Sequence, residues 1–225
     1  ALPPPTTHHG TIDTTIIESA AETVGQALQE KSTNHVVVTK STVVPTTTAE
    51  TIAPALVESS GKTIGDDLHV AMNPEFLREG SAVADFQNPD KVVFGTQSDD
   101  EVALDTLHGV FEPLVDTIEP TIVETGIEEG EMIKYANNGF LASKVSLIND
   151  IGNICKEFGF DAYEVADAIG LDDRIGEQFL RSGLGWGGSC FPKDTNAIIA
   201  AACDAGYEPT MLEAAVDVND GQPER

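Results

Sequence analysis

The 225-residue sequence predicts an α/β fold that gives way to an all-helical portion after about residue 125. Short apolar runs rich in β-branched residues alternate with stretches of helical spacing, which is typical of βαβ units in a doubly wound, mostly parallel sheet. Beyond this region, residues 127–158 contain no proline, and apolar residues recur at helical spacing. A single helix of about 30 residues, or about 45 Å, is therefore expected there as a spine between domains.

Each element of the first portion has its own pattern. Val36, Val37 and Val38 form a short apolar run that suits a buried parallel strand. The other strands are expected on similar grounds, and helices are expected between them. The predicted strands cover residues 34–39, 68–72, 92–94 and 121–123. The predicted helices cover residues 13–30, 48–58, 79–86 and 99–112. The proline-rich start, residues 1–5, indicates the end of a strand followed by a rigid turn.

The second portion is expected to consist of helices alone. After the long helix, apolar spacing predicts further helices at residues 161–169, 195–205 and 211–219. The predicted domains are therefore residues 1–125, of α/β type, and residues 126–225, of helical type.

Composition excludes several classes of protein. With 38 acidic and 12 basic residues, the net charge of −26 argues against nucleic-acid binding, which needs a basic surface. Such a charge is found in ordinary acidic proteins, but it also suits a salt-rich cytoplasm, where screening reduces self-repulsion, and we favour the second interpretation. No apolar run approaches the ~20 residues of a membrane span, and no signal segment opens the chain. Three widely spaced cysteines indicate a reducing cytoplasm, with no disulfide framework and no metal site.

The segment at residues 185–194, Gly-Trp-Gly-Gly-Ser-Cys-Phe-Pro-Lys-Asp, carries the strongest chemical signal. Glycines let the backbone approach a ligand closely, and a nearby cation or helix N-terminus favours the thiolate of Cys190. A buried structural cysteine is the commoner fate of a free thiol. The polar, glycine-rich setting here favours a reactive one.

This segment resembles the active-site segment of the UDP-glucose/GDP-mannose dehydrogenase family. The resemblance implies an NAD-dependent oxidation of a nucleotide sugar, in which a C6 alcohol becomes a carboxylate through a thioester on Cys190. It also implies a homodimer. Phe191 and Pro192 favour the UDP-glucose branch, and the GDP-mannose and UDP-N-acetylhexosamine branches are the alternatives. A truncated, inactive dimerisation module of the family is the main alternative, and a thiol hydrolase is a weaker one because no histidine lies in a recognisable partner motif.

Residues 73–80, Asn-Pro-Glu-Phe-Leu-Arg-Glu-Gly, follow a predicted strand, at the edge where open α/β sheets bind ligands. Glu75 and Glu79 are four residues apart, so both lie on one face if the segment is helical; acids at a helix N-terminus are the ordinary explanation. By resemblance, Glu75 is the general base of thioester hydrolysis and Glu79 lies near nicotinamide and sugar. Phe76 and Leu77 are expected to contact the substrate.

Lys134 and Asn138 are one helical turn apart on the long predicted helix. A solvated surface lysine is the ordinary expectation. The surrounding Lys-x-x-x-Asn-Gly-Phe-Leu-Ala resembles the family's central helix, which implies that Lys134 and Asn138 bind substrate and stabilise an oxyanion during the thiol chemistry. Asp194 would help to place the hydrolytic water.

Ser41 and Thr42 follow the valine strand, where hydroxyl groups cap helices or bind ligands. By resemblance both contact the cofactor, and Thr42 also orders the hydrolytic water. Thr46 stands where the family commonly has glycine, and Pro4 stands where it usually has threonine. These departures concern the cofactor side of the site.

Arg174 and Arg181 precede the cysteine segment, and guanidinium groups suit phosphate and sugar oxygens. A surface ion pair is the ordinary alternative for each. By resemblance, Arg174 reaches the neighbouring subunit's substrate, while Arg181 and Gly185 lie on this subunit's substrate side. The family's Gly-x-Gly-x-x-Gly loop and C-terminal domain have no counterpart here, so the chain is expected to hold the second half of the nucleotide-binding domain and the central helical domain, as a fragment or a truncated product.

Overall fold

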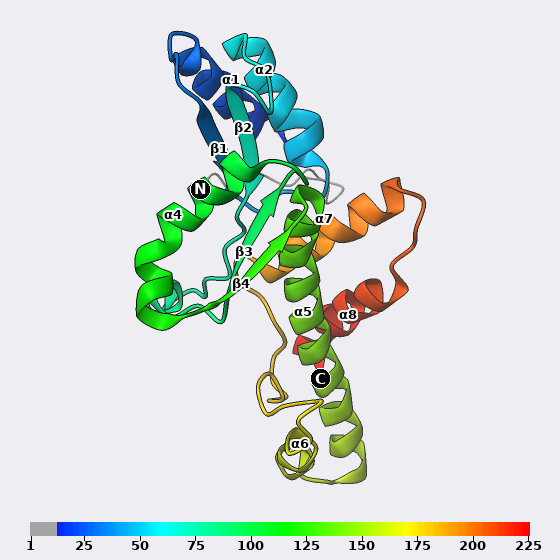
Figure 1. Cartoon of the computed structure of the whole chain (residues 1–225). Coiled ribbons are helices and arrows are strands. Elements are labelled where there is room, and N and C mark those ends of the chain that lie inside the picture. The colour runs from blue at the N-terminus through cyan, green and yellow to red at the C-terminus, as the bar shows by residue number, and fades with distance from the viewer. Residues whose placement is uncertain (1–12) are drawn as a thin grey trace. The chain divides into compact units, whose positions relative to one another are not determined.

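The computed structural model describes residues 13–225, which form two compact units, one ending at Lys134 and one running from Tyr135 to Arg225 (Figure 1). The strand end expected at residues 1–5, with Pro4, lies outside the described residues. The boundary between the units along the chain falls within the long helix α5 (Ile127–Phe158), whose observed bounds match the predicted helix. The division predicted at residue 125 stays a prediction.

The first unit is built on a four-stranded sheet in the order β1-β2-β3-β4. Pairing is parallel between β1 and β2 and between β3 and β4, while β2 and β3 pair antiparallel through two residue pairs. The mostly parallel sheet predicted from the sequence is therefore confirmed, with one antiparallel step at its centre. The strands are β1 (His35–Thr39), β2 (Leu68–Met72), β3 (Lys91–Thr96) and β4 (Thr121–Thr125).

Helices cover both faces of this sheet, as expected for a doubly wound fold (Figure 1). On one face of the sheet, side chains of α1 and α2 pack with Leu68, Val70 and Met72 of β2. On the other face, α4 packs with Ala71 of β2 and Phe94 of β3. Alternate residues of a strand point to opposite faces, so both faces of β2 are buried. The helical elements are α1 (Thr15–Leu28), η1 (Thr48–Ile52), α2 (Ala53–Ser60), α3 (Ala82–Gln87) and α4 (Glu101–Ile118).

The second unit is helical. Ile148 of α5 packs with Ala166 and Leu180 in its core, and Ser146 donates a hydrogen bond to the carbonyl oxygen of Ala215 at 2.6 Å, joining α5 to α8. The elements after α5 are α6 (Ala162–Gly170), α7 (Phe191–Asp204), α8 (Thr210–Gly221) and η2 (Gln222–Glu224). The expected helices are confirmed, with α7 beginning earlier than predicted because Pro192 fits the first turn of a helix.

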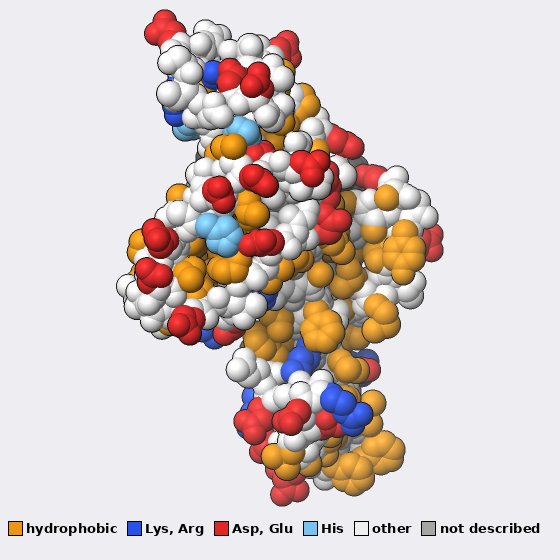
Figure 2. Space-filling view, viewed as in Figure 1, with side chains coloured by type: hydrophobic (Ala, Val, Ile, Leu, Met, Phe, Trp, Pro, Cys, Tyr) orange, Lys and Arg blue, Asp and Glu red, His pale blue; other side chains and the backbone are white. Residues whose placement is uncertain are grey.

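The surface and the cysteines agree with the composition. Figure 2 shows acidic side chains spread over the visible face rather than gathered in one patch. All three cysteines are free, with Cys155 buried and Cys190 and Cys203 exposed. Within residues 13–225, none of the helices has the length and apolar character needed to cross a bilayer.

Candidate active site

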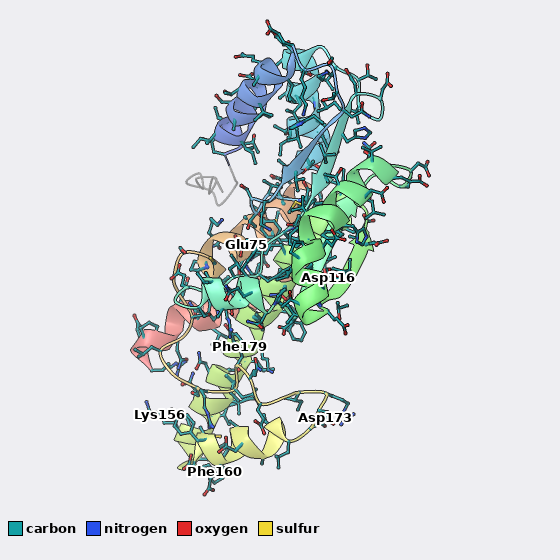
Figure 3. All side chains as sticks on the ribbon, turned by 60° about the vertical axis from the view of Figure 1, so that its left-hand side comes forward. Glu75, Asp116, Lys156, Phe160, Asp173 and Phe179 are labelled. Carbon is teal, nitrogen blue, oxygen red and sulfur yellow. The ribbon has the colours of Figure 1, made fainter. Side chains whose placement is uncertain are left out.

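Glu75 and Lys134 form an ion pair in the first unit. Glu75 lies in the loop that leaves the carboxyl end of β2 (Figure 3), and its Oε1 is 3.1 Å from Lys134 Nζ. Lys134 is only 4% exposed, so the ordinary surface-lysine interpretation is wrong for this residue. Its ammonium group also lies 5.5 Å from the centroid of the Phe76 ring, a cation–π distance.

The expectation that Glu75 and Glu79 share a helical face is wrong. Residues 73–79 form no helix, and α3 begins only at Ala82. Glu75 Oε2 accepts a hydrogen bond from the backbone N–H of Leu77 at 2.6 Å, which stabilises a local turn instead. Gly80 then adopts a φ of 86°, which favours glycine and separates the loop from α3.

Two residues of this region were not among the predicted site residues. Lys40, the first residue after β1, donates a hydrogen bond from Nζ to Asn73 Oδ1 at 2.7 Å. Asn73 Nδ2 in turn donates to the carbonyl oxygen of Val93 at 2.8 Å. Partial burial lowers the pKa of Lys40, and the negative charge of Glu75 opposes this shift. We call Lys40, Asn73, Glu75 and Lys134 the sheet-edge cluster.

Ser41 and Thr42 lie beside this cluster in sequence and are half-buried. Because β1 and β2 are parallel, the loops after Thr39 and Met72 leave the same edge of the sheet. Thr46, at the position where the resemblance led us to expect glycine, has a φ of 78°. This left-handed conformation is costly for a β-branched residue, so the loop keeps a glycine-like backbone without glycine.

In the second unit, Cys190 is the N-cap residue of α7. Its carbonyl oxygen accepts the N–H of Asp194 at 2.8 Å, while its thiol is exposed and lies 3.7 Å from Ser189 Oγ. The alternative of a buried structural cysteine is therefore wrong. A thiol at the start of a 14-residue helix lies where the helix dipole favours an anion.

Asn138 and Asp194 meet beneath the start of α7. Asn138 Nδ2 donates to Asp194 Oδ2 at 2.7 Å, and both side chains are buried. Lys193 Nζ lies 3.3 Å from the other carboxylate oxygen, Oδ1. The hydrogen bond joins α5 to α7. It brings together two residues, more than fifty positions apart, to which the family resemblance gives roles in the chemistry.

The loop that carries Cys190, residues 183–190, is held from several sides, and we call it the cysteine loop. Gly185 has a φ of 101°, and a Cβ there would lie 2.6 Å from Asn219 Oδ1, so a side chain is excluded. The same oxygen accepts the N–H of Trp186 at 2.7 Å, and Trp186 Nε1 donates to Ser146 Oγ at 2.8 Å. No sequence signal pointed to Asn219, which lies on α8 among ordinary polar helix residues.

Arg174 and Arg181 both form surface ion pairs in this structure. Arg174 is paired with Asp172 at 2.6 Å, and Arg181 with Asp167 at 2.8 Å. Both guanidinium groups are exposed. The predicted roles of these residues toward a substrate therefore stay predictions.

Each unit thus presents one group of candidate residues. The first offers hydroxyl groups, a carboxylate and a buried cation, and the second offers an exposed thiol with an amide–carboxylate pair. Lys134 and Asn138 lie one turn apart on α5, and each belongs to one of the two groups. Taken singly, the first group contains a carboxylate of the kind used as a general base, and the second contains a thiol of the kind used as a nucleophile.

Comparison with known proteins identifies the family of the chain. Residues 1–115 match the NAD binding domain, and residues 128–221 the central domain, of the UDP-glucose/GDP-mannose dehydrogenase family. UDP-glucose 6-dehydrogenase AglM of Haloferax volcanii is 62% identical over 226 residues, covering 100% of this chain and 52% of the relative. UDP-glucose 6-dehydrogenase TuaD of Bacillus subtilis is 42% identical, covering 99% of this chain and 46% of the relative.

A solved structure is also similar over nearly the whole chain. A UDP-glucose dehydrogenase from the hyperthermophilic archaeon Pyrobaculum islandicum has a TM-score of 0.89 and 41% sequence identity, covering 98% of this chain and 49% of that one. The chain spans about half the length of the relatives it matches. The NAD cofactor predicted from the sequence agrees with the match to an NAD binding domain.

Proposed function

Because the chain belongs to the UDP-glucose/GDP-mannose dehydrogenase family, we propose that it supplies half of an NAD-dependent dehydrogenase that oxidises the C6 alcohol of UDP-glucose to the carboxylate. The observation that carries the proposal is the placement of Cys190, an exposed thiol at the N-cap of α7 in a loop held by Asn219 and Ser146. The 62% identity to a UDP-glucose 6-dehydrogenase favours this sugar nucleotide over GDP-mannose.

The residues at the end of β1 fit the nicotinamide side of the cofactor. Ser41 and Thr42 offer half-buried hydroxyl groups at the carboxyl edge of a parallel strand pair, where open α/β sheets bind dinucleotides. Glu79, exposed on the neighbouring loop, is proposed to lie near both nicotinamide and sugar. NAD supplies the hydride acceptor for each of the two oxidations.

Cys190 acts between these oxidations. Its thiolate adds to the C6 aldehyde and forms a carbon–sulfur bond, and the former carbonyl oxygen carries the negative charge that develops. Lys134 and Asn138 donate hydrogen bonds to that oxygen, which then takes up a proton to give the thiohemiacetal. Removal of the second hydride from the same carbon leaves a thioester on Cys190.

Hydrolysis then releases the product. Glu75 takes a proton from a water molecule held by Thr42 and Asp194, and the resulting hydroxide adds to the thioester carbon. The Cys190 thiolate leaves, and the sugar carboxylate is formed. The ion pair with Lys134 holds the Glu75 carboxylate in place at the end of β2.

The remaining predicted residues are proposed to bind the sugar nucleotide. Phe76 and Leu77 follow Glu75 on the same loop, and Gly185 lets the backbone of the cysteine loop approach the sugar. Arg181 is proposed to contact the nucleotide, and Arg174 the substrate of a partner subunit. Both arginines must exchange their present carboxylate partners for substrate oxygens.

We also propose a homodimer formed through α5. Phe140, Leu147 and Ile154 are 72%, 61% and 52% exposed, and their spacing of seven residues places them along one face of the helix. A solvent-exposed apolar stripe of this kind is typical of a helix-pairing surface. Sedimentation equilibrium of the L147D variant against the unmodified protein tests this, with weaker dimerisation expected.

We further propose adaptation to a salt-rich cytoplasm. The net charge of −26 and the scattered acidic side chains are consistent with it, as is the similarity to a Haloferax protein. Screening by multimolar KCl reduces the repulsion among these carboxylates, so thermal stability is expected to rise with KCl concentration. Equal stability at low and multimolar KCl would contradict the proposal.

The enzymatic function is tested by the intact mass of the native protein and by NADH formation from UDP-glucose in high salt. Two NADH per sugar are expected, with GDP-mannose and a UDP-N-acetylhexosamine assayed in parallel to decide the substrate. Faster turnover of either alternative would reassign the branch. A native chain of 23.8 kDa that forms no NADH from any of the three would favour the truncated, inactive module.

A further inference from the structure

Glu131 is a fully buried carboxylate that the proposed chemistry does not use. It lies near the start of α5, one residue after Gly130, where the helix packs closely on the sheet. A Cβ at Gly130 would lie 3.3 Å from Met72 Cγ and 3.5 Å from Gly95 Cα. Burying a carboxylate in such a place is costly unless its oxygens are hydrogen-bonded.

Both oxygens of Glu131 accept hydrogen bonds from the loop after β1. Oε2 accepts the N–H of Thr46 at 2.7 Å, and Oε1 accepts the N–H of Thr48 at 2.8 Å. These amides belong to the start of the η1–α2 helical segment, whose N-cap residue Thr47 makes no side-chain capping bond. Glu131 therefore caps this helical start from a different element.

The hydrogen bond from Thr46 to Glu131 Oε2 is made with Thr46 in a left-handed backbone conformation, with a φ of 78°. A non-glycine residue in this region persists only when its surroundings compensate for the strain. Thr48 is fixed a second time, because its hydroxyl group donates to Thr39 Oγ1 at 3.2 Å. This hydrogen bond links the two ends of the loop that contains Ser41 and Thr42, at Thr39 and Thr48.

Glu131 lies three residues before Lys134 on α5. The same stretch of helix therefore holds the exit of the Ser41–Thr42 loop through Glu131 and holds Glu75 through Lys134. Burial raises the pKa of Glu131, and the hydrogen bonds from Thr48 and Thr46 oppose this shift. Both effects are expected for a buried carboxylate that accepts hydrogen bonds from backbone amides.

We propose that Glu131 is a positioning residue that fixes the loop carrying Ser41 and Thr42 relative to the Glu75–Lys134 pair, and thereby sets the affinity for NAD. Its effect on the cofactor depends on the proposed dehydrogenase function. Its effect on the loop does not. A capping role limited to stability is the competing explanation.

The test compares the E131Q variant with the E129Q variant in the full-length protein. Both changes remove one carboxylate from the start of α5, but Glu129 is exposed. In E131Q, an amide group replaces one acceptor oxygen and faces a backbone N–H. Losing one charge-assisted hydrogen bond predicts a KM for NAD raised about tenfold, with the KM for UDP-glucose changed less than about twofold. E129Q is expected to leave both values unchanged.

Hydrogen–deuterium exchange provides a readout that needs no activity. Peptides covering residues 40–48 are expected to exchange about tenfold faster in E131Q, whereas peptides of β3 keep their rate. Unchanged exchange in residues 40–48 would overturn the proposal. Faster exchange with an unchanged KM for NAD would also overturn it, in favour of a purely structural cap.

The two proposals fail separately. If the unmodified protein forms no NADH, the dehydrogenase proposal fails, and the exchange of residues 40–48 still decides whether Glu131 orders the loop. The titration of NAD into both variants then replaces KM as the measure of cofactor affinity. Equal binding by E131Q and E129Q, or no binding by the unmodified protein, would overturn the cofactor part of the inference.

Discussion

The sheet-edge cluster and the cysteine loop hold their polar groups in different ways. In the first, a buried ammonium group is paired with a carboxylate, and the members hydrogen-bond mainly through side chains. In the second, the Cys190 thiol is exposed and its loop is fixed through backbone N–H groups that donate to amide oxygens, as Gly183 does to Asn149 and Trp186 to Asn219. The comparison indicates that substitutions in the cluster will affect stability and activity together, whereas the thiol itself can be replaced at little structural cost.

The Cys190→Ser substitution should have the largest effect on activity. The thiol is exposed and makes one weak contact with Ser189, so the folded structure is expected to be unchanged. Loss of the covalent nucleophile is expected to lower kcat by about a thousandfold or more. Cys203→Ser, which alters an exposed cysteine at the other end of α7, is the control and should keep full activity. Comparable activity in both variants would remove Cys190 from the mechanism.

Lys134→Met should lower stability, in contrast to Cys190→Ser. The change leaves Glu75, whose side chain is 26% exposed, without its cation, and breaking a largely buried ion pair of this kind is expected to cost about 2 kcal/mol. Chemical unfolding measures this cost, and Lys156→Met on the exposed part of the same helix serves as the control. An unfolding free energy equal to that of the control would mean that the pair contributes nothing to stability.

Asn219→Ala tests the cysteine loop without touching the thiol. The partly buried N–H of Trp186 loses its acceptor, which is expected to cost about 1 kcal/mol. Trp186 is the chain's single tryptophan, so its fluorescence reports directly on the loop. A red shift is expected in Asn219→Ala and none in Asn196→Ala, whose exposed side chain donates to the carbonyl oxygen of Pro192 in the first turn of α7. An unshifted spectrum would show that the loop is held by other contacts.

The sequence predicts features that depend on neighbouring residues better than features that depend on contacts made in the folded chain. The bounds of α5 and β2 follow from local periodicity and are confirmed, and Cys190 at a helix start follows from nearby glycine and proline. The helical face expected for Glu75 and Glu79 is wrong because Glu75 bonds to the backbone of Leu77 instead.

Residues that act through distant partners could not be found from sequence. Asn219 meets Trp186 from 33 positions away, and Glu131 meets Thr48 from 83 positions away. Neither stands out in a run of polar helix residues, since only the tertiary structure brings the partners together. Lys40 had a usable signal, because it directly follows a buried strand at the edge where the predicted hydroxyl groups lie.

The smallest expected effect concerns the pH dependence of stability in the first unit. Burial raises the pKa of Glu131 above its ordinary value of 4.5, and the charge of Glu128 acts in the same direction. Between 4.5 and the raised pKa, the folded protein keeps a proton that the unfolded chain has lost, so stability falls as pH rises through this window. E131Q does not titrate there and provides the reference. We therefore expect the unfolding free energy of the unmodified protein to fall relative to E131Q as pH rises, in urea titrations at constant KCl. A relative rise would mean that the hydrogen bonds from Thr46 and Thr48 lower the pKa of Glu131 by more than burial raises it. The loop amides would then stabilise the ionised carboxylate.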